Sequence, residues 1–150
     1  MTRRKYAAPI RWLNGDGQER RDPRELVHAF LDVEIAYNAN GPWLKTTFQV
    51  DTGLSKTSVL PSLLKQIGSP KTGTVKLSGS AGWQEFSCHI CLLRFPGYPA
   101  QAIGVEAATL DHPLGNTSAG GLLGMDAMLQ GTLHLDPSGG QSFFEIPVAG

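Results

Sequence analysis

The sequence has little cysteine and no surplus of charge of either sign. Two cysteines in 150 residues are too few for the disulfide framework of a small secreted domain or for a four-cysteine zinc site. Thirteen basic residues balance 13 acidic ones, so the formal net charge is zero. A general nucleic-acid binder or a binder of anionic membranes needs a basic surplus. We therefore expect no nucleic-acid partner and no membrane partner.

Long apolar runs are also missing. No stretch approaches the roughly 20 apolar residues of a membrane-spanning helix. The basic start Met1–Lys5 resembles the beginning of a signal peptide, but Arg11, Asn14 and Asp16 interrupt the place where its apolar segment would lie. We therefore expect a cytoplasmic protein. Charged residues make up only 17% of the chain, and a neutral surface of this kind favours self-association.

The residues that commonly bind metals do not form a pattern here. Cys88 and Cys91 have C-x-x-C spacing, but they lie in an apolar-rich segment that predicts a strand. Side chains three apart on a strand point to opposite faces. We interpret these two residues as reduced, partly buried structural cysteines. We expect no metal and no other cofactor, because the four histidines are scattered along the chain: His28, His89, His112 and His134.

What the sequence does contain is apolar residues, glycine and proline. Its 41% apolar content, with 18 glycines and 10 prolines, favours an all-β fold with many turns and one or two short helices. The length suits one compact domain. We place that domain at residues 31–146, with a C-terminal tail at 147–150. Residues 1–30 are polar and form an N-terminal extension, either a hairpin around the turn signal at 14–17 or a flexible arm.

Alternating apolar residues predict the elements of this domain. The expected helices are 61–68, closed by a glycine, and 125–130. The expected strands are 31–37, 43–50, 58–60, 74–77, 84–95, 102–105, 121–124, 132–135 and 142–146.

The triplet Asp51-Thr52-Gly53 follows the strand expected at 43–50. A strand that ends in this way can present one carboxylate at a tight turn, beside a hydroxyl and an exposed glycine amide. Two such carboxylates facing each other across an axis could activate a water molecule. The triplet occurs once, so a symmetric partner would have to supply the second acid. An ordinary turn is the alternative reading, because Asp and Gly are favoured in turns.

Three features together resemble the retroviral-type aspartic proteases, the retropepsins, and especially their cellular single-domain relatives. These are the triplet at 51–53, a glycine-rich hairpin about 25 residues later, and the segment Leu122-Leu123-Gly124-Met125-Asp126. The likeness covers roughly residues 31–146. It implies a closed β-barrel or sandwich, the acid protease fold, and a homodimer that cleaves a peptide or protein substrate.

The resemblance also implies roles for particular residues. Asp51 is the catalytic acid and base, Thr52 links the two loops across the axis, and Gly53 allows a close approach. Leu122, Leu123 and Gly124 thread beside the catalytic loop, and residues 142–146 contribute to the interface sheet. The expected substrate-binding residues are Leu54, Ser55 and the flap Gly79, Ser80, Ala81, Gly82 and Trp83. Trp83 contacts substrate or anchors the hairpin by packing, and we expect a structural role for Asp126 near the short helix.

Two departures from the family pattern bear on activity. Leu54 stands where the family usually has a small residue beside the peptide pocket. Ser55 and Met125 lack the acidic and arginine pair that braces the viral dimers. The alternative hypothesis is therefore a protease-like fold that dimerises or binds peptides with little or no turnover. A domain that cuts itself out of a larger polyprotein is a further alternative.

Overall fold

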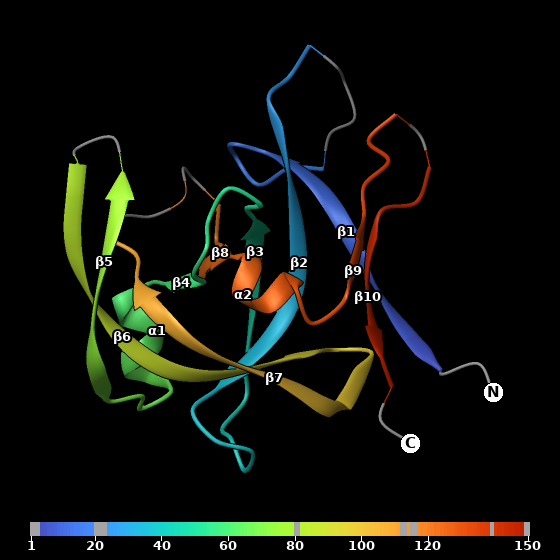
Figure 1. Ribbon diagram of the computed structural model, residues 1–150. Coiled ribbons are helices and arrows are strands. Elements are labelled where there is room, and N and C mark those ends of the chain that lie inside the picture. Colours follow the sequence, from blue (N-terminus) through green and yellow to red (C-terminus); the bar gives the residue numbers. More distant parts are fainter. Residues whose placement is uncertain are drawn as a thin grey trace.

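The computed structural model describes residues 4–19, 24–79, 82–111, 114, 117–138 and 140–148. Within these residues the chain forms ten strands and two short helices (Figure 1). All ten strands join one continuous sheet in the order β5-β6-β7-β4-β8-β3-β2-β1-β10-β9, and β6 also pairs with β2. The expected all-β class with short helices is confirmed. Over the same residues, no helix is both long and apolar enough to cross a membrane.

The first strand lies where the sequence suggested an arm. β1 (Lys5–Asn14) pairs antiparallel with β2 (Val27–Ala36) through its second half and with β10 (Phe143–Pro147) through its first half. Ala8, Ile10 and Leu13 on this strand are buried. The flexible-arm expectation is therefore wrong for residues 5–14. Most residues of this strand are apolar, and their side chains are removed from water when the strand joins the sheet.

The strand pair before the triplet is an antiparallel hairpin, as expected. β2 runs with its alternate residues Leu31, Val33 and Ile35 in the core, and each is at most 1% exposed. It pairs with β3 (Leu44–Val50), in which Phe48 is completely buried. Alternation of this kind is typical of strands with one buried face. It sets the register of the β2–β3 pair, which places residue 51 directly after the end of β3.

The centre of the sheet mixes parallel and antiparallel pairs. β3 lies parallel to β8 (Gly121–Leu123), and β8 lies antiparallel to β4 (Ser58–Val59). β4 in turn lies parallel to β7 (Tyr98–Thr109). The segment that follows β3 and the segment that precedes the second helix therefore lie side by side in the sheet, although about 70 residues separate them in sequence.

A long hairpin forms the other side of the molecule. β5 (Lys71–Gly79) and β6 (Gly82–Phe95) pair antiparallel up to Gly79 opposite Gly82, and β6 also pairs with β7. The tip of this hairpin and the loop after β3 project toward the same end of the molecule in Figure 1. The two residues between these strands, Ser80 and Ala81, lie outside the described residues.

Both helices are short. α1 (Pro61–Gln66) begins with proline. Gly68, two residues after its last residue, has a φ of +72° that is readily adopted only by glycine. The Ser69 amide donates to the Leu64 carbonyl at 3.1 Å, and the Gly68 amide donates to the Lys65 carbonyl at 3.1 Å. These two bonds form a Schellman closure of the helix. The glycine stop expected from the sequence is confirmed.

The second helix, α2 (Met125–Met128), leads through Gly131 into β9 (Thr132–His134). Its Ala127 and Met128 are buried in the main core. That core contains three phenylalanines that are at most 2% exposed: Phe48, Phe95 and Phe144. Phe30, which is 1% exposed, packs in a smaller second cluster with Leu13 and Ala119.

Candidate active site

Asp51 comes directly after the last residue of β3, where this strand lies beside β8. Its backbone amide donates to the Leu123 carbonyl at 3.0 Å, so the parallel pairing with β8 extends one residue past the strand. The Asp51 side chain is only partly buried. Its Oδ1 accepts a hydrogen bond from the Gly53 amide at 3.0 Å. The carboxylate is therefore oriented by the loop that carries it and is still open to solvent or a partner.

Thr52 and Gly53 are the exposed part of this loop. The Leu54 amide donates to the Asp51 carbonyl at 3.2 Å, which closes a tight turn. Among the described residues, the Thr52 hydroxyl has no hydrogen-bond partner. The triplet contains one carboxylate, that of Asp51. The triplet thus lies on the surface with an unused hydroxyl.

The loop after the triplet rests on the start of α2. The Leu54 carbonyl accepts a bond from the Met125 amide at 2.8 Å, and the Ser55 carbonyl accepts one from the Asp126 amide at 3.3 Å. Gly124 makes this contact possible. A Cβ added there would lie 2.7 Å from the Lys56 carbonyl carbon and 2.8 Å from the Thr57 nitrogen. Only glycine lets the two backbones come this close.

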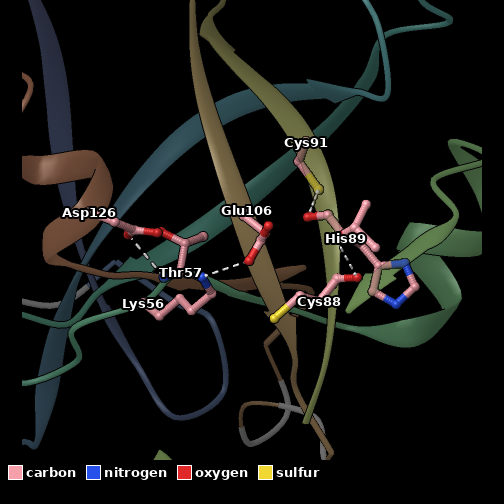
Figure 2. A network of polar contacts seen from close by, with 8 residues as sticks. Lys56, Thr57, Cys88, His89, Cys91, Glu106 and Asp126 are labelled. Atoms are coloured by element: carbon pink, nitrogen blue, oxygen red, sulfur yellow. Dashed lines mark hydrogen bonds and ion pairs between the residues drawn. The ribbon is translucent and has the colours of Figure 1, made fainter. Parts of the chain in front are cut away.

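Hydrogen bonds between Thr57 and Asp126 connect the loop after the triplet with the start of α2. Asp126 Oδ1 accepts from the Thr57 hydroxyl at 2.7 Å, from the Thr57 amide at 2.9 Å and from the Ala127 amide at 2.9 Å (Figure 2). The Thr57 hydroxyl in turn accepts from the Gly124 amide at 3.0 Å. These are the contacts of a structural carboxylate. The sequence indicated that Asp126 acts at the helix, but nothing in it pointed to Thr57 as its partner.

Two of the positions that depart from the family pattern, Ser55 and Met125, contact their surroundings differently. Met125 is partly buried and packs against the main core. Ser55 is exposed. In place of a side-chain brace, these positions are connected by the backbone bonds to α2 described above. The loop is therefore attached to α2 by hydrogen bonds within one chain.

The expected flap is the β5–β6 hairpin. Gly79 and Gly82 face each other at its end, and Gly82 has a φ of +89°. Trp83 lies on β6 opposite Ser78 and is 74% exposed. An indole this exposed does not anchor the hairpin by packing, so the packing alternative is wrong. Of the two alternatives for Trp83, contact with a substrate stays as a prediction.

A polar cluster that the sequence did not predict lies beside the loop. Lys56 Nζ lies 3.2 Å from Glu106 Oε1 on β7, next to the thiol of Cys88 on β6 (Figure 2). Burial raises the pKa of Cys88, the Lys56 ammonium lowers it, and Glu106 raises it, with the net direction upward. Only strand pairing brings these residues together, because 50 residues separate Lys56 from Glu106.

Both cysteines are buried free thiols. Burial raises the pKa of Cys91 to about 12, so it remains protonated at neutral pH. Cys91 lies in the main core, and Cys88 does not belong to that cluster. Across the described part of the chain, no group of three His, Cys, Asp or Glu residues is placed to hold a metal ion.

With this geometry established, the chain was compared with known proteins. No protein-family model and no curated protein sequence matches it. Its structure is similar to that of a retropepsin-like aspartic protease from Rickettsia conorii, with a TM-score of 0.61 and 14% sequence identity. The match covers 99% of this chain and 98% of that one. The chain therefore has the acid protease fold of the retropepsin-like proteins.

Proposed function

We propose that the protein is an aspartic endopeptidase that is active as a homodimer. One observation carries the proposal. In an acid protease fold, Asp51 sits on a surface loop with its carboxylate held by the Gly53 amide, and the neighbouring Thr52 hydroxyl has no partner among the described residues. Each chain contributes one acid, and a second copy of the same loop supplies the other.

Two Asp51 carboxyls about 3 Å apart cannot both ionise, so the pair shares one proton. The ionised carboxylate takes a proton from a bound water molecule, whose oxygen forms a bond to the carbonyl carbon of the scissile peptide. The protonated carboxyl donates to the carbonyl oxygen. When the C–N bond breaks, the leaving amine takes a proton from the pair. No covalent intermediate with the enzyme and no cofactor is required.

The remaining expected site residues have supporting roles in this proposal. Thr52 hydrogen-bonds across the axis to fix the spacing of the two acids. The flap residues 79–83 close over a peptide that binds in an extended conformation along the cleft. Leu54 and Ser55 line the pocket beside the catalytic loop. Leu122, Leu123, Gly124 and Asp126 support that loop.

The decisive experiment is cleavage of an unstructured peptide at mildly acidic pH. Asp51→Asn should reduce the rate to background, because an amide cannot share the proton. Asp16→Asn, at an exposed aspartate in the turn after β1, is the matched control and should leave the rate unchanged. Cleavage that survives in Asp51→Asn would refute the assignment. A hydroxyl-bearing, pepstatin-like mimic of the tetrahedral intermediate should raise the melting temperature of the wild type.

Leu54 favours a second candidate, a dimerising peptide-binding module with little turnover. Its side chain is larger than the family norm and is only partly buried on the catalytic loop. In that case peptides would bind and remain intact, and Asp51→Asn would bind them as well as the wild type does.

A further inference from the structure

We propose that a pocket on the outer face of the β2–β3 pair binds a free α-amino acid, whose carboxylate contacts Lys45 and whose ammonium contacts Asp32. None of the described residues that line this pocket belongs to the catalytic loop or to the flap. The proposal therefore goes beyond the proposed protease activity and does not depend on it.

The pocket is large enough for a small molecule. Its volume is about 470 Å³, within the range of about 300–1,000 Å³ that is usual for small-molecule sites. Residues of β2 and β3 line it, together with Pro96 from the turn after β6 and Ser118 from the loop before β8. Two strands and two separate loops thus surround one cavity.

Strand alternation places three polar lining residues, Asp32, Lys45 and Thr47, on the outer face of the sheet. Their neighbours Val33 and Phe48 are buried in the main core, and successive side chains of a strand point to opposite faces. Asp32 lies directly opposite Thr47 in the β2–β3 ladder, and Lys45 precedes Thr47 by two residues. Diagonal neighbours of this kind lie about 7–8 Å apart. Asp32 and Lys45 are therefore close enough to contact the same small ligand.

Lys45 is a cation without a counterion on this face. Glu34 lies opposite Lys45 in the ladder, but its Oε2 is 3.3 Å from Arg94 Nη2. The Arg94 guanidinium in turn lies 4.0 Å from the centre of the Trp43 ring, a cation–π contact that helps to hold it in place. In the described part of the chain, Lys45 is exposed and forms no ion pair. An anionic group in the pocket would therefore meet an ammonium that is not yet neutralised.

Asp32 supplies the opposite charge. Its Oδ1 accepts a hydrogen bond from Arg11 Nη2, while its Oδ2 has no partner among the described residues. The Asp32 side chain is 48% exposed, so this second oxygen can accept a bond from a ligand. The pocket thus offers an ammonium and a carboxylate oxygen that do not contact each other.

These two groups match the two charges of an α-amino acid. The ammonium and the carboxylate of such a ligand are bonded to one carbon atom, so one small molecule can reach both Asp32 and Lys45. Hydrogen bonds between charged groups are stronger than those between neutral ones. The Thr47 hydroxyl, which can donate or accept, lies on the same face. Pro96 offers apolar surface at the rim, which favours an aliphatic side chain on the ligand.

The wall that carries Ser118 is held in place by backbone contacts. The Gly120 amide donates to the Thr47 carbonyl at 2.8 Å. A Cβ at Gly120 would lie 2.5 Å from Thr46 Oγ1, so the segment lies tightly against β3. Ala119 is buried in the smaller second cluster. The pocket is therefore formed before a ligand arrives, which lowers the cost of binding.

Ligand titration of the isotope-labelled wild type, followed by amide chemical shifts, tests the pocket. L-leucine should cause saturable shifts at Asp32, Lys45 and Thr47, with a Kd in the millimolar range because the charged groups are exposed to solvent. Isocaproate is leucine without its amino group, and isoamylamine is leucine without its carboxylate. Each should bind at least about 10-fold more weakly than leucine.

Matched variants assign the contacts. Lys45→Gln and Asp32→Asn should each raise the Kd for leucine at least about 10-fold, since each removes one charged partner. Lys76→Gln, at an exposed lysine on β5, is the control and should leave the Kd unchanged. Absence of saturable shifts in the wild type, or an unchanged Kd in Lys45→Gln, would overturn the site. Isocaproate that binds as tightly as leucine would refute the role of Asp32 and with it the amino acid assignment.

Discussion

The hydroxyl of Thr57 donates a hydrogen bond to Asp126 Oδ1 across 2.7 Å and accepts one from the Gly124 amide at 3.0 Å. Thr57 has no solvent exposure. One side chain therefore connects the loop that carries Asp51 with the start of α2, in a place where water cannot replace it. The positions of the loop that carries Asp51 and of α2 depend on the same pair of bonds.

Thr57→Val tests this connection. The change keeps the shape of the side chain, removes one of the three donors to Asp126 and leaves the Gly124 amide buried without a partner. We expect the free energy of unfolding to fall by about 2–3 kcal/mol, measured by urea denaturation. Thr57→Ser retains the hydroxyl and should cost clearly less. Equal losses for the valine and serine variants would show that packing of the methyl group dominates.

Gly124→Ala tests the close approach of two backbones. The added Cβ meets backbone atoms of Lys56 and Thr57 at 2.7–2.8 Å, and these atoms cannot rotate away as a flexible side chain would. We expect a loss of about 1–3 kcal/mol in unfolding free energy, accompanied by loss of peptide cleavage. Gly15→Ala is the control, because a Cβ there has no neighbour within 4 Å. A fully stable, active Gly124→Ala protein would contradict the structure at this point.

The buried Cys91 thiol predicts loss of stability at high pH. Its pKa is raised from 9.0 to about 12 in the folded chain, so between these values the unfolded chain releases a proton that the folded chain keeps. The stability is fully present below pH 9 and declines above it, by at most about 1.4 kcal/mol per pH unit. Cys91→Ala should flatten this part of the profile, although its overall stability will be lower because of the cavity. Urea midpoints measured between about pH 8 and pH 10.5 provide the comparison.

Leu54→Ala tests whether this side chain restricts the peptide pocket. If the protein is a protease, removing it should speed cleavage of peptides with bulky residues at the scissile bond by roughly 10-fold. Peptides with alanine on both sides of that bond are the internal control and should change little. A uniform fall in kcat/KM for both kinds of peptide would instead show that Leu54 supports the loop.

Much of the fold followed from local patterns in the sequence. Alternation at Leu31, Val33 and Ile35 predicted β2, and proline before an apolar turn with glycine behind it predicted α1. These elements are specified by residues close together in the chain, so a single sequence reveals them. The Asp51 triplet stood out for the same reason, because its three residues and the strand before it are contiguous.

Contacts made across the sheet have no comparable local signal. β1 escapes local prediction because its buried residues Ala8, Ile10 and Leu13 do not alternate regularly along the strand, and it is its pairing with β2 and β10 that makes it a strand. The bonds between Thr57 and Asp126 join residues 69 positions apart. Their partnership depends on β8 lying between β3 and β4, which no local pattern encodes.

The pairing of β1 with β10 also brings the two ends of the described chain together. The Val148 amide donates to the Arg4 carbonyl at 2.8 Å. A short linker could join these ends, and the polypeptide could then be opened at the exposed turn around Asp16 to give a circular permutant. The same adjacency would let this domain be inserted into a surface loop of a host protein with little distortion of either one.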